Sequence, residues 1–412
     1  MVERRRLLRR PRFGALLGPD AAGVRQSLVA LTLSGTTSLV AGLTLGSATG
    51  RLEALPGLLL LVPAAIALRG NIYGALGSRL STAIHTGTFR MSVRAGTVVG
   101  QNVLASMALT LGLSLALAVL AKGVAVGFGI ADTISIADLV VVSVVGGVLA
   151  SVVVLLITLA LASGSVRFGW DLDNVIAPLV TAIGDLVTLP ALILASYLVG
   201  VRIVTPVLAG AFAVTAAVAI AASLRSGLAQ LQRILFESLP VLTIAGVLDL
   251  VAGISIEKRL DSFVALPALL VFVPGFLETA GALGGILSNR LGTKLHLGLI
   301  EFAAWPGRAA RRDIAIVFAL SGPVFLLVAV VAHYGSGLAG LASPGLGDMV
   351  GVALLGGLLA TVFVVAVAYY GTMAAVRFGL DPDTYGIPVV TSSLDLVGAF
   401  VLVLAIVTLG VT

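Results

Sequence analysis

One stretch of this chain occurs twice. The segment VRFGWDLDNVIAPLVTAIGDLVTLPALILA begins at Val166, and VRFGLDPDTYGIPVVTSSLDLVGAFVLVLA begins at Val376, 210 residues later and without a gap. Each copy is a long apolar run with one acidic residue in its middle, Asp185 in the first and Asp395 in the second. The fold must therefore hold two equivalent apolar segments, each with an internal carboxyl group.

The duplication extends well beyond these two segments. VPAAIALRGNIYGALGSRLSTAIHTG from Val62 matches VPGFLETAGALGGILSNRLGTKLHLG from Val273, a shift of 211 residues. Each half carries five long apolar runs in the same order, and an eleventh run, 203–224, separates the halves. We therefore predict a first repeat at 1–202, which includes a basic N-terminus, a linking helix at 203–228 and a second repeat at 229–412.

The composition places this chain in a membrane. Of its 412 residues, 59% are hydrophobic and only 11% are charged. A membrane-spanning helix needs about 20 mostly apolar residues, so we expect an all-α polytopic membrane protein. There is no cysteine, and the net charge of +6 follows the membrane pattern and indicates no nucleic-acid partner. The expected spans are 27–49, 56–78, 96–121, 136–163, 175–200, 203–224, 238–257, 263–287, 312–333, 347–372 and 385–411.

The distribution of basic residues predicts the orientation in the cell membrane. Loops on the cytoplasmic side carry an excess of Lys and Arg. With eleven spans, this rule places the N-terminus in the cytoplasm and the C-terminus outside. Five spans per half is an odd number, so the extra span restores the orientation of the second half. The halves should then be related by a pseudo-two-fold axis along the membrane normal, which would place Asp185 and Asp395 at equal depth.

The fifth span of each half carries a polar stripe. Thr181 and Asp185 share one helix face with Pro178, and Thr391 and Asp395 repeat this spacing with Pro388. A carboxylate at the centre of a membrane helix costs about 2.5–3.5 kcal/mol and indicates a functional site by default. Oxygen ligands suit a hard cation such as Mg²⁺. The alternative is that each Asp is protonated or only bonds a neighbouring helix.

Four more acidic residues precede these stripes. They could form a cytoplasmic vestibule that concentrates cations, or they could simply cap and begin the helices. The sequence leaves both interpretations open. The four residues are Asp171, Asp173, Asp381 and Asp383.

Other polar residues differ between the halves. Asn71 could offer a carbonyl oxygen to a hydrated ion, but its counterpart is Ala282. Asp249 stands opposite Ser38, and Glu278 also has no acidic counterpart. We interpret the additional carboxyl groups as pore-lining residues or as a second ion or proton site. The alternative is that each is satisfied by a neighbour such as Arg69.

These motifs resemble the membrane domain of the MgtE family of magnesium channels, and most closely its duplicated relatives, the solute carrier family 41 magnesium transporters. The resemblance is carried by Gly70-Asn71 followed by SRLST at Ser78, and by FGLDPDTYGIPVVTSSLDLVG from Phe378. It implies a fused pseudo-dimer with a central pore for Mg²⁺. It also implies that Asp395 and Asp185 match the pore carboxylate and that Asp381 belongs to the Asp-Pro start of the last span.

We therefore predict a divalent-cation transporter rather than an enzyme, with Mg²⁺ as the principal ion and Mn²⁺, Co²⁺ or Na⁺ as further possibilities. The chain should function as a monomeric pseudo-dimer in the lipid bilayer. One rival is a carrier that couples the divalent ion to Na⁺ or H⁺. A remote rival is an intramembrane aspartyl protease, but its Gly-x-Gly-Asp motif is only half present at Gly184-Asp185 and absent before Asp395.

Overall fold

The structure is a computed structural model, and it describes residues 21–130, 133–168, 172–296, 298–301, 303–377 and 387–411. All regular structure in this part is helical, which confirms the all-α class. Ten of its helices are long and apolar enough to cross a membrane. The 27-residue helix α2 takes the place of the first expected span. The chain is therefore a multi-pass membrane protein.

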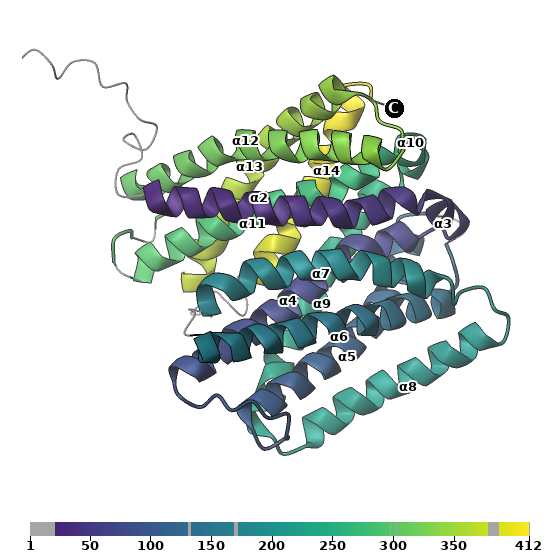
Figure 1. The fold of residues 1–412 in the computed structure, drawn as a ribbon, viewed down its shortest axis with the longest axis vertical. Helices are drawn as coiled ribbons and strands as arrows, with labels where there is room; N and C mark the ends of the chain where they lie inside the picture. The colour runs from purple at the N-terminus through teal and green to yellow at the C-terminus, as the bar shows by residue number, and fades with distance from the viewer. Residues whose placement is uncertain are drawn as a thin grey trace, which may run out of the picture.

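The helices follow the duplicated order of the sequence (Figure 1). Within the described residues, six helices belong to each half, and α8 links the halves. The first half contains α2 (Ala21–Ser47), α3 (Thr49–Ala54), α4 (Leu58–His85), α5 (Val98–Gly127), α6 (Ile136–Phe168) and α7 (Leu172–Ser196). After α8 (Val204–Arg225) come α9 (Ala229–Glu257), α10 (Leu260–Ala265), α11 (Pro267–His296), α12 (Arg308–Leu338), α13 (Leu346–Arg377) and α14 (Ile387–Thr408).

Several helices are longer than the expected spans. Helix α4 continues to His85 and α11 to His296, well beyond the predicted ends at 78 and 287, and α9 begins at Ala229 rather than at 238. Hydropathy marks only the part of a helix that lies in hydrocarbon. A helix whose polar turns project past the lipid satisfies its backbone hydrogen bonds there as well, so these helices extend beyond the apolar spans that the sequence predicts.

The first long helix of each half packs against the other half. Helix α2 lies along α11 and α12, while α9 lies along α4 and α5. Figure 1 shows the purple α2 among the green helices of the second half. Each of these helices also contacts the last helix of its own half, α2 with α7 and α9 with α14. The halves are thus interlocked by two exchanged helices.

Glycines at matched positions make this exchange possible. A Cβ atom on Gly42 of α2 would overlap the backbone oxygen of Val271 in α11. A Cβ atom on Gly253 of α9 would lie 2.9 Å from the Cα atom of Leu60 in α4 and would overlap its backbone oxygen. Gly42 and Gly253 are equivalent residues, as are Leu60 and Val271. Small residues allow membrane helices to approach closely, and here they do so twice in the same way.

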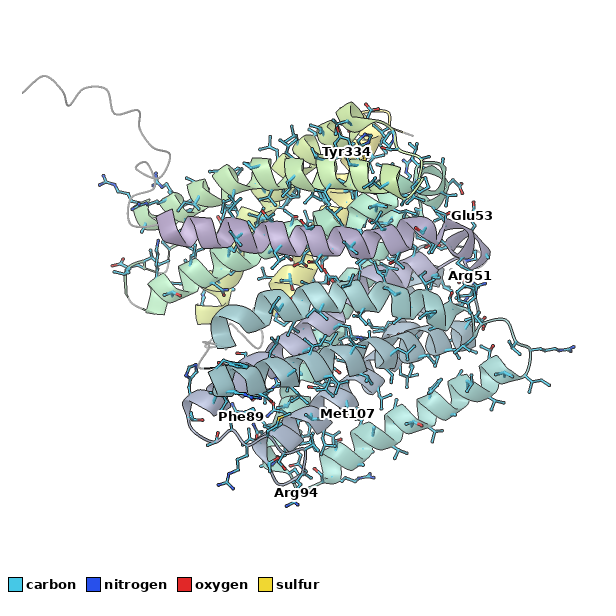
Figure 2. All side chains as sticks on the ribbon, viewed as in Figure 1. Arg51, Glu53, Phe89, Arg94, Met107 and Tyr334 are labelled. Atoms are coloured by element: carbon cyan, nitrogen blue, oxygen red, sulfur yellow. The ribbon has the colours of Figure 1, made fainter. Side chains whose placement is uncertain are left out.

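The helix ends carry different side chains at the two ends of the bundle. Figure 2 shows Arg51 and Glu53 at one end, and Phe89 and Arg94 at the other. The end with Arg94 also carries Arg79 and Arg290, each six residues before the C-terminal end of α4 or α11, and we call it the basic end. Helix α8 lies at the edge, on α5 and α6 (Figure 1), and of its residues only Thr205, Ala209 and Ala216 are buried.

Candidate functional site: a cavity between the two halves

A cavity of about 560 Å³ lies where the two halves meet. It is lined by residues of α2, α4, α5, α7, α9, α11 and α14. Many of its wall residues form equivalent pairs, such as Pro63 with Pro274 and Gly70 with Gly281. Asp185 and Asp395 line this cavity, as do Thr181 and Thr391. The structure therefore brings the two duplicated polar stripes to one cavity.

Helices α4 and α7 lie in contact beside the first stripe. A Cβ atom on Gly184 would lie 3.9 Å from the backbone nitrogen of Gly70, and a Cβ atom on Gly70 would lie 3.8 Å from the Thr181 methyl carbon. Close contact between α4 and α7 thus directs Thr181 and Asp185 toward the cavity. The side chain of Asp185 is 2% exposed and accepts a hydrogen bond of 2.5 Å from Ser38 Oγ of α2.

The second stripe is less tightly held. Asp395 is half-buried and lines the cavity, and no described side chain donates a hydrogen bond to its carboxyl group. Thr391 Oγ1 donates to the backbone oxygen of Pro388 at 3.1 Å. Pro388 lies in the first turn of α14 as the structure describes it, where a missing backbone N–H costs little.

Glu278 brings a third carboxyl group to the cavity. It lies on α11 and accepts a hydrogen bond of 2.5 Å from Ser34 Oγ of α2. This contact crosses from one half to the other because α2 is exchanged. Its partner is therefore a serine and not Arg69. Asn71 of α4 also lines the cavity, at the position where the second half has Ala282.

Asp249 does not line the cavity. It is 1% exposed on α9, and its Oδ2 atom accepts a hydrogen bond of 3.0 Å from Ser392 Oγ of α14. Its other oxygen, Oδ1, is buried without a hydrogen-bond partner. Asp249 thus lies outside this cavity, and its role as a pore-lining residue or part of a second site stays a prediction. It forms a separate buried polar pair.

The predicted vestibule lies largely outside the described residues. Asp171, Asp381 and Asp383 are not described, and Asp173 falls in the first turn of α7 with an undescribed side chain. The vestibule remains a prediction from the sequence.

The carboxyl groups of the cavity do not form a closed metal cage. Within the described residues, no group of three or more His, Asp or Glu side chains lies close enough to hold a metal ion directly. Mg²⁺ dehydrates reluctantly and usually keeps several waters beside one or two carboxylates. A wide cavity with separated carboxyl groups suits such a partly hydrated ion better than a bare one.

The cavity opens toward the basic end. Its wall there includes Ser78 and Asn289, which are exposed, and the partly exposed Arg79. Along α4 the lining runs from Pro63 to Arg79, about 24 Å at 1.5 Å per residue. Beyond Pro63 the wall is closed by buried leucines of α4, 0–1% exposed, that pack against α9 through Gly253. The cavity is therefore accessible from one end and sealed at the other.

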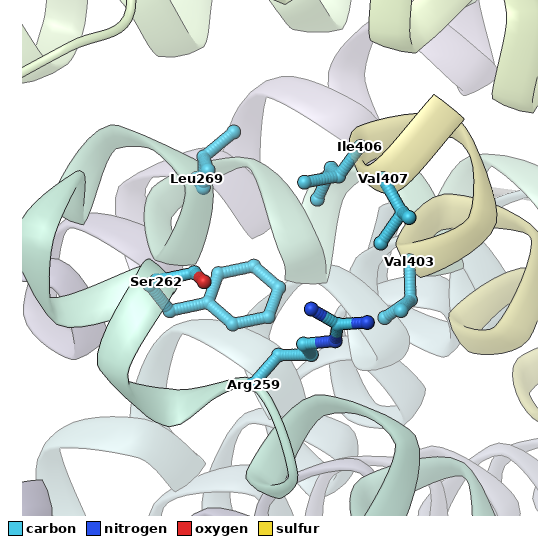
Figure 3. A pocket seen from close by; sticks show the side chains of 7 residues that line it. Arg259, Ser262, Leu269, Val403, Ile406 and Val407 are labelled. Carbon is cyan, nitrogen blue, oxygen red and sulfur yellow. The ribbon is translucent and has the colours of Figure 1, made fainter. Parts of the chain in front are cut away.

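A second pocket lies near the sealed end but is too small for an ion with its water shell. Figure 3 shows it between Arg259 and Ser262, at the start of α10, and Val403 and Ile406 of α14. Its volume is about 10 Å³, and a cavity needs roughly 10–15 Å³ for a single water. We assign it no role in transport.

Sequence reasoning missed the hydroxyl groups that hold the carboxyl groups. Ser34, Ser38 and Ser392 each donate to a different acid. Serine is common in membrane helices, and nothing in the chain order indicates that α2 reaches both Asp185 and Glu278. For Ser38 the repeat offered an indication, because Ser38 occupies the position equivalent to the acidic Asp249.

Comparisons with known proteins agree with this architecture. The family model MgtE, described as a divalent cation transporter, matches residues 62–195 and 273–405, the same two stretches that the duplication relates. The chain is 25% identical over 400 residues to solute carrier family 41 member 3 of Rattus norvegicus, covering 92% of this chain and 86% of the relative.

Two further relatives give similar values. Solute carrier family 41 member 3 of Mus musculus is 26% identical over 84% of this chain and 74% of its own length. Solute carrier family 41 member 2 of Xenopus laevis is 27% identical over 92% of this chain and 71% of its own length. No solved structure gives a significant match.

Proposed function

This chain belongs to the MgtE family of divalent cation transporters, and from that premise we propose that it moves Mg²⁺ across the cell membrane through the cavity between its halves. It is a transporter rather than an enzyme, which excludes the aspartyl protease hypothesis. The observation that carries the proposal is that Asp185 and Asp395, equivalent residues of the two repeats, line the same cavity.

A partly hydrated Mg²⁺ would bind between these two carboxyl groups. Thr181, Thr391, Asn71 and Glu278 contribute further oxygen atoms to the same wall, and these oxygens contact the retained waters of the ion. Asp249 has no direct contact with the ion in this conformation. The acidic residues Asp171, Asp173, Asp381 and Asp383 would attract cations to the open end, which we assign to the cytoplasmic side together with the N-terminus.

Charge removal at the two acids tests the proposal. Asp185→Asn and Asp395→Asn keep the shape of each side chain, and we expect either variant to reduce Mg²⁺ flux into proteoliposomes by tenfold or more, the equivalent of about 1.4 kcal/mol of lost stabilisation. Asp348→Asn, at an exposed aspartate at the start of α13, is the matched control and should leave flux unchanged. Flux at the normal rate in both cavity variants would refute the site. Competition by Mn²⁺, Co²⁺ and Na⁺ in the same assay measures selectivity.

A second candidate is a carrier that couples the divalent ion to Na⁺ or H⁺. The observation in its favour is that the cavity opens at one end only, which is typical of a carrier between two access states. The unmatched Glu278 offers a group for a second ion. Imposed Na⁺ and pH gradients separate the two functions, because a channel responds to them only through the membrane potential, whereas a coupled carrier is driven by one of them at zero potential.

A further inference from the structure

Arg69 is a buried cation without an anionic partner. It lies on α4, 1% exposed, and its Nη2 atom donates to Ser114 Oγ of α5 at 3.1 Å. Its Nε and Nη1 atoms are buried without any hydrogen-bond partner. No described carboxylate forms an ion pair with it. Arginine stays charged in proteins, and burying an unpaired charge is costly, so this guanidinium group needs a counter-charge.

Arg69 lies at one end of a buried row of polar side chains between α4, α5 and α6, which we call the seam. We define the seam by Arg69 and Tyr73 of α4, by Ser106, Thr110 and Ser114 of α5, and by Ser151 of α6. The Tyr73 hydroxyl is 3.2 Å from Thr110 Oγ1, which is 3.1 Å from Ser151 Oγ. Ser106, Thr110 and Ser114 are spaced four residues apart, so they follow one face of α5.

Several buried polar atoms of this seam have no hydrogen-bond partner. Nine buried side-chain nitrogen or oxygen atoms in the described part of the chain have no hydrogen-bond partner, and three of them belong to the seam: Nε and Nη1 of Arg69 and Oγ of Ser106. Buried polar groups normally have partners, and an exception indicates an unseen water or ion. Two of the three atoms belong to the charged Arg69 guanidinium group, which indicates that the seam holds a ligand beside Arg69.

The second half shows what the same interface looks like without a charge. The position of Arg69 is Ala280 there, and that of Ser114 is Phe325. The Phe325 ring fills the interface, with its centroid 4.9 Å from that of Phe276, and its Cγ atom lies 2.5 Å from a Cβ atom built on Gly357. In the first half Gly147, equivalent to Gly357, faces the Arg69 guanidinium instead. The helix packing therefore does not need an arginine at this place.

We propose that the seam binds a small monovalent anion, of which chloride is the model, against the free N–H groups of Arg69. The seam offers hydroxyl and N–H donors but, in its described residues, no carboxylate, which favours an anion over a cation. An anion would also screen the charge of Arg69 from the neighbouring cation cavity, whose wall includes the next residue, Gly70. This site is separate from Asp185 and Asp395.

Anion-dependent stability of the purified protein tests the site. Chloride would be replaced stepwise by the bulky organic anion gluconate, at constant ionic strength and without Mg²⁺. We expect Tm to rise with chloride and to saturate, since a ligand that binds only the folded state stabilises it by mass action. Equilibrium binding of radioactive chloride should saturate over the same concentration range.

Two variants remove the site in different ways. Arg69→Met deletes the charge, and the double variant Arg69→Ala with Ser114→Phe copies the packing of the second half, so it should fold even if the single variant does not. Both should lose the chloride-dependent shift in Tm and the bound chloride. Arg290→Gln, at an arginine that pairs with Asp313, is the control and should keep both.

Two results would overturn the anion site. One is a wild-type Tm that does not respond to chloride, which would mean that water alone fills the seam. The other is a chloride response that persists in the double variant, which would place the anion elsewhere. Because these measurements contain no Mg²⁺, neither result depends on the proposed cation site.

Discussion

At the basic end, the two halves pair equivalent arginines with differently charged side chains. In the first half Arg79 Nε donates to the neutral Asn102 Oδ1 at 2.6 Å. In the second half the equivalent Arg290 Nε donates to the carboxylate of Asp313 at 2.9 Å, and Lys294 also pairs with Asp313 at 2.6 Å. The second cluster adds one negative and one positive charge together, so both clusters keep the same net charge. The geometry of the repeat is preserved while its chemistry changes.

The same lesson holds in the membrane interior. Helices α2 and α7 are joined by a hydroxyl on the first helix and a carboxyl group on the last, Ser38 with Asp185. Helices α9 and α14 reverse this, with the carboxyl group of Asp249 on the first and Ser392 on the last. The equivalent of Asp185, Asp395, is thereby left free to face the cavity. The two equivalent carboxyl groups, Asp185 and Asp395, thus have different environments.

The first prediction concerns the close glycine contact that both halves share. We expect Gly42→Ala and Gly253→Ala to destabilise the protein equally, each near the upper end of the roughly 1–3 kcal/mol typical of overpacking, because each new methyl group would overlap a backbone oxygen of the other half. Thermal unfolding in detergent measures this. Gly210→Ala in α8, which would meet nothing within 4 Å, is the control. Normal stability of both variants would contradict the exchange of α2 and α9.

The second prediction makes the two basic ends alike. Asp313→Asn gives the second half the neutral partner of the first, and leaves Arg290 and Lys294 without their carboxylate. The acid is fully buried but its partners are 20% and 24% exposed. We therefore expect a loss of about 1–2 kcal/mol, below the 3–5 kcal/mol of a fully buried pair. Chemical denaturation would measure it, and Asn102→Asp should cost less because Arg79 gains a carboxylate. A larger loss for Asn102→Asp would show that the clusters are not equivalent.

The third prediction separates the two reversed pairs. Ser38→Ala and Ser392→Ala each remove one hydrogen bond from a buried acid, at a cost of about 1 kcal/mol. Only Ser38 holds an acid that lines the cavity, so we expect Ser38→Ala to change the apparent affinity for Mg²⁺ by severalfold and Ser392→Ala to change stability alone. Flux titration and thermal unfolding on both variants give the comparison. An equal effect of the two changes on flux would place Asp249 on the ion path after all.

The sequence could predict the spans and the two central acids. The apolar runs are long, and the backbone of a membrane helix must satisfy its own hydrogen bonds, so a run of that length has few alternatives to a helix. The register of the repeat paired Asp185 with Asp395. The sequence could not show that Asp249 lies outside the cavity, because Asp249 and Glu278 are both single acidic residues within apolar runs. Their difference depends on which neighbouring helix supplies the serine.

The amino-acid sequence by itself determined the helices, the duplication and the equivalence of its residues, because these depend on local hydropathy and on register. Only the tertiary structure decided that α2 and α9 exchange places, that Glu278 therefore meets Ser34 of the other half, and that Arg69 is left without a counter-charge. Hydrophobic and van der Waals contacts between apolar helices are not directional, so an apolar helix can pack beside many partners. The choice among them comes from close contacts such as those of Gly42 and Gly253, which exist only once the helices have met.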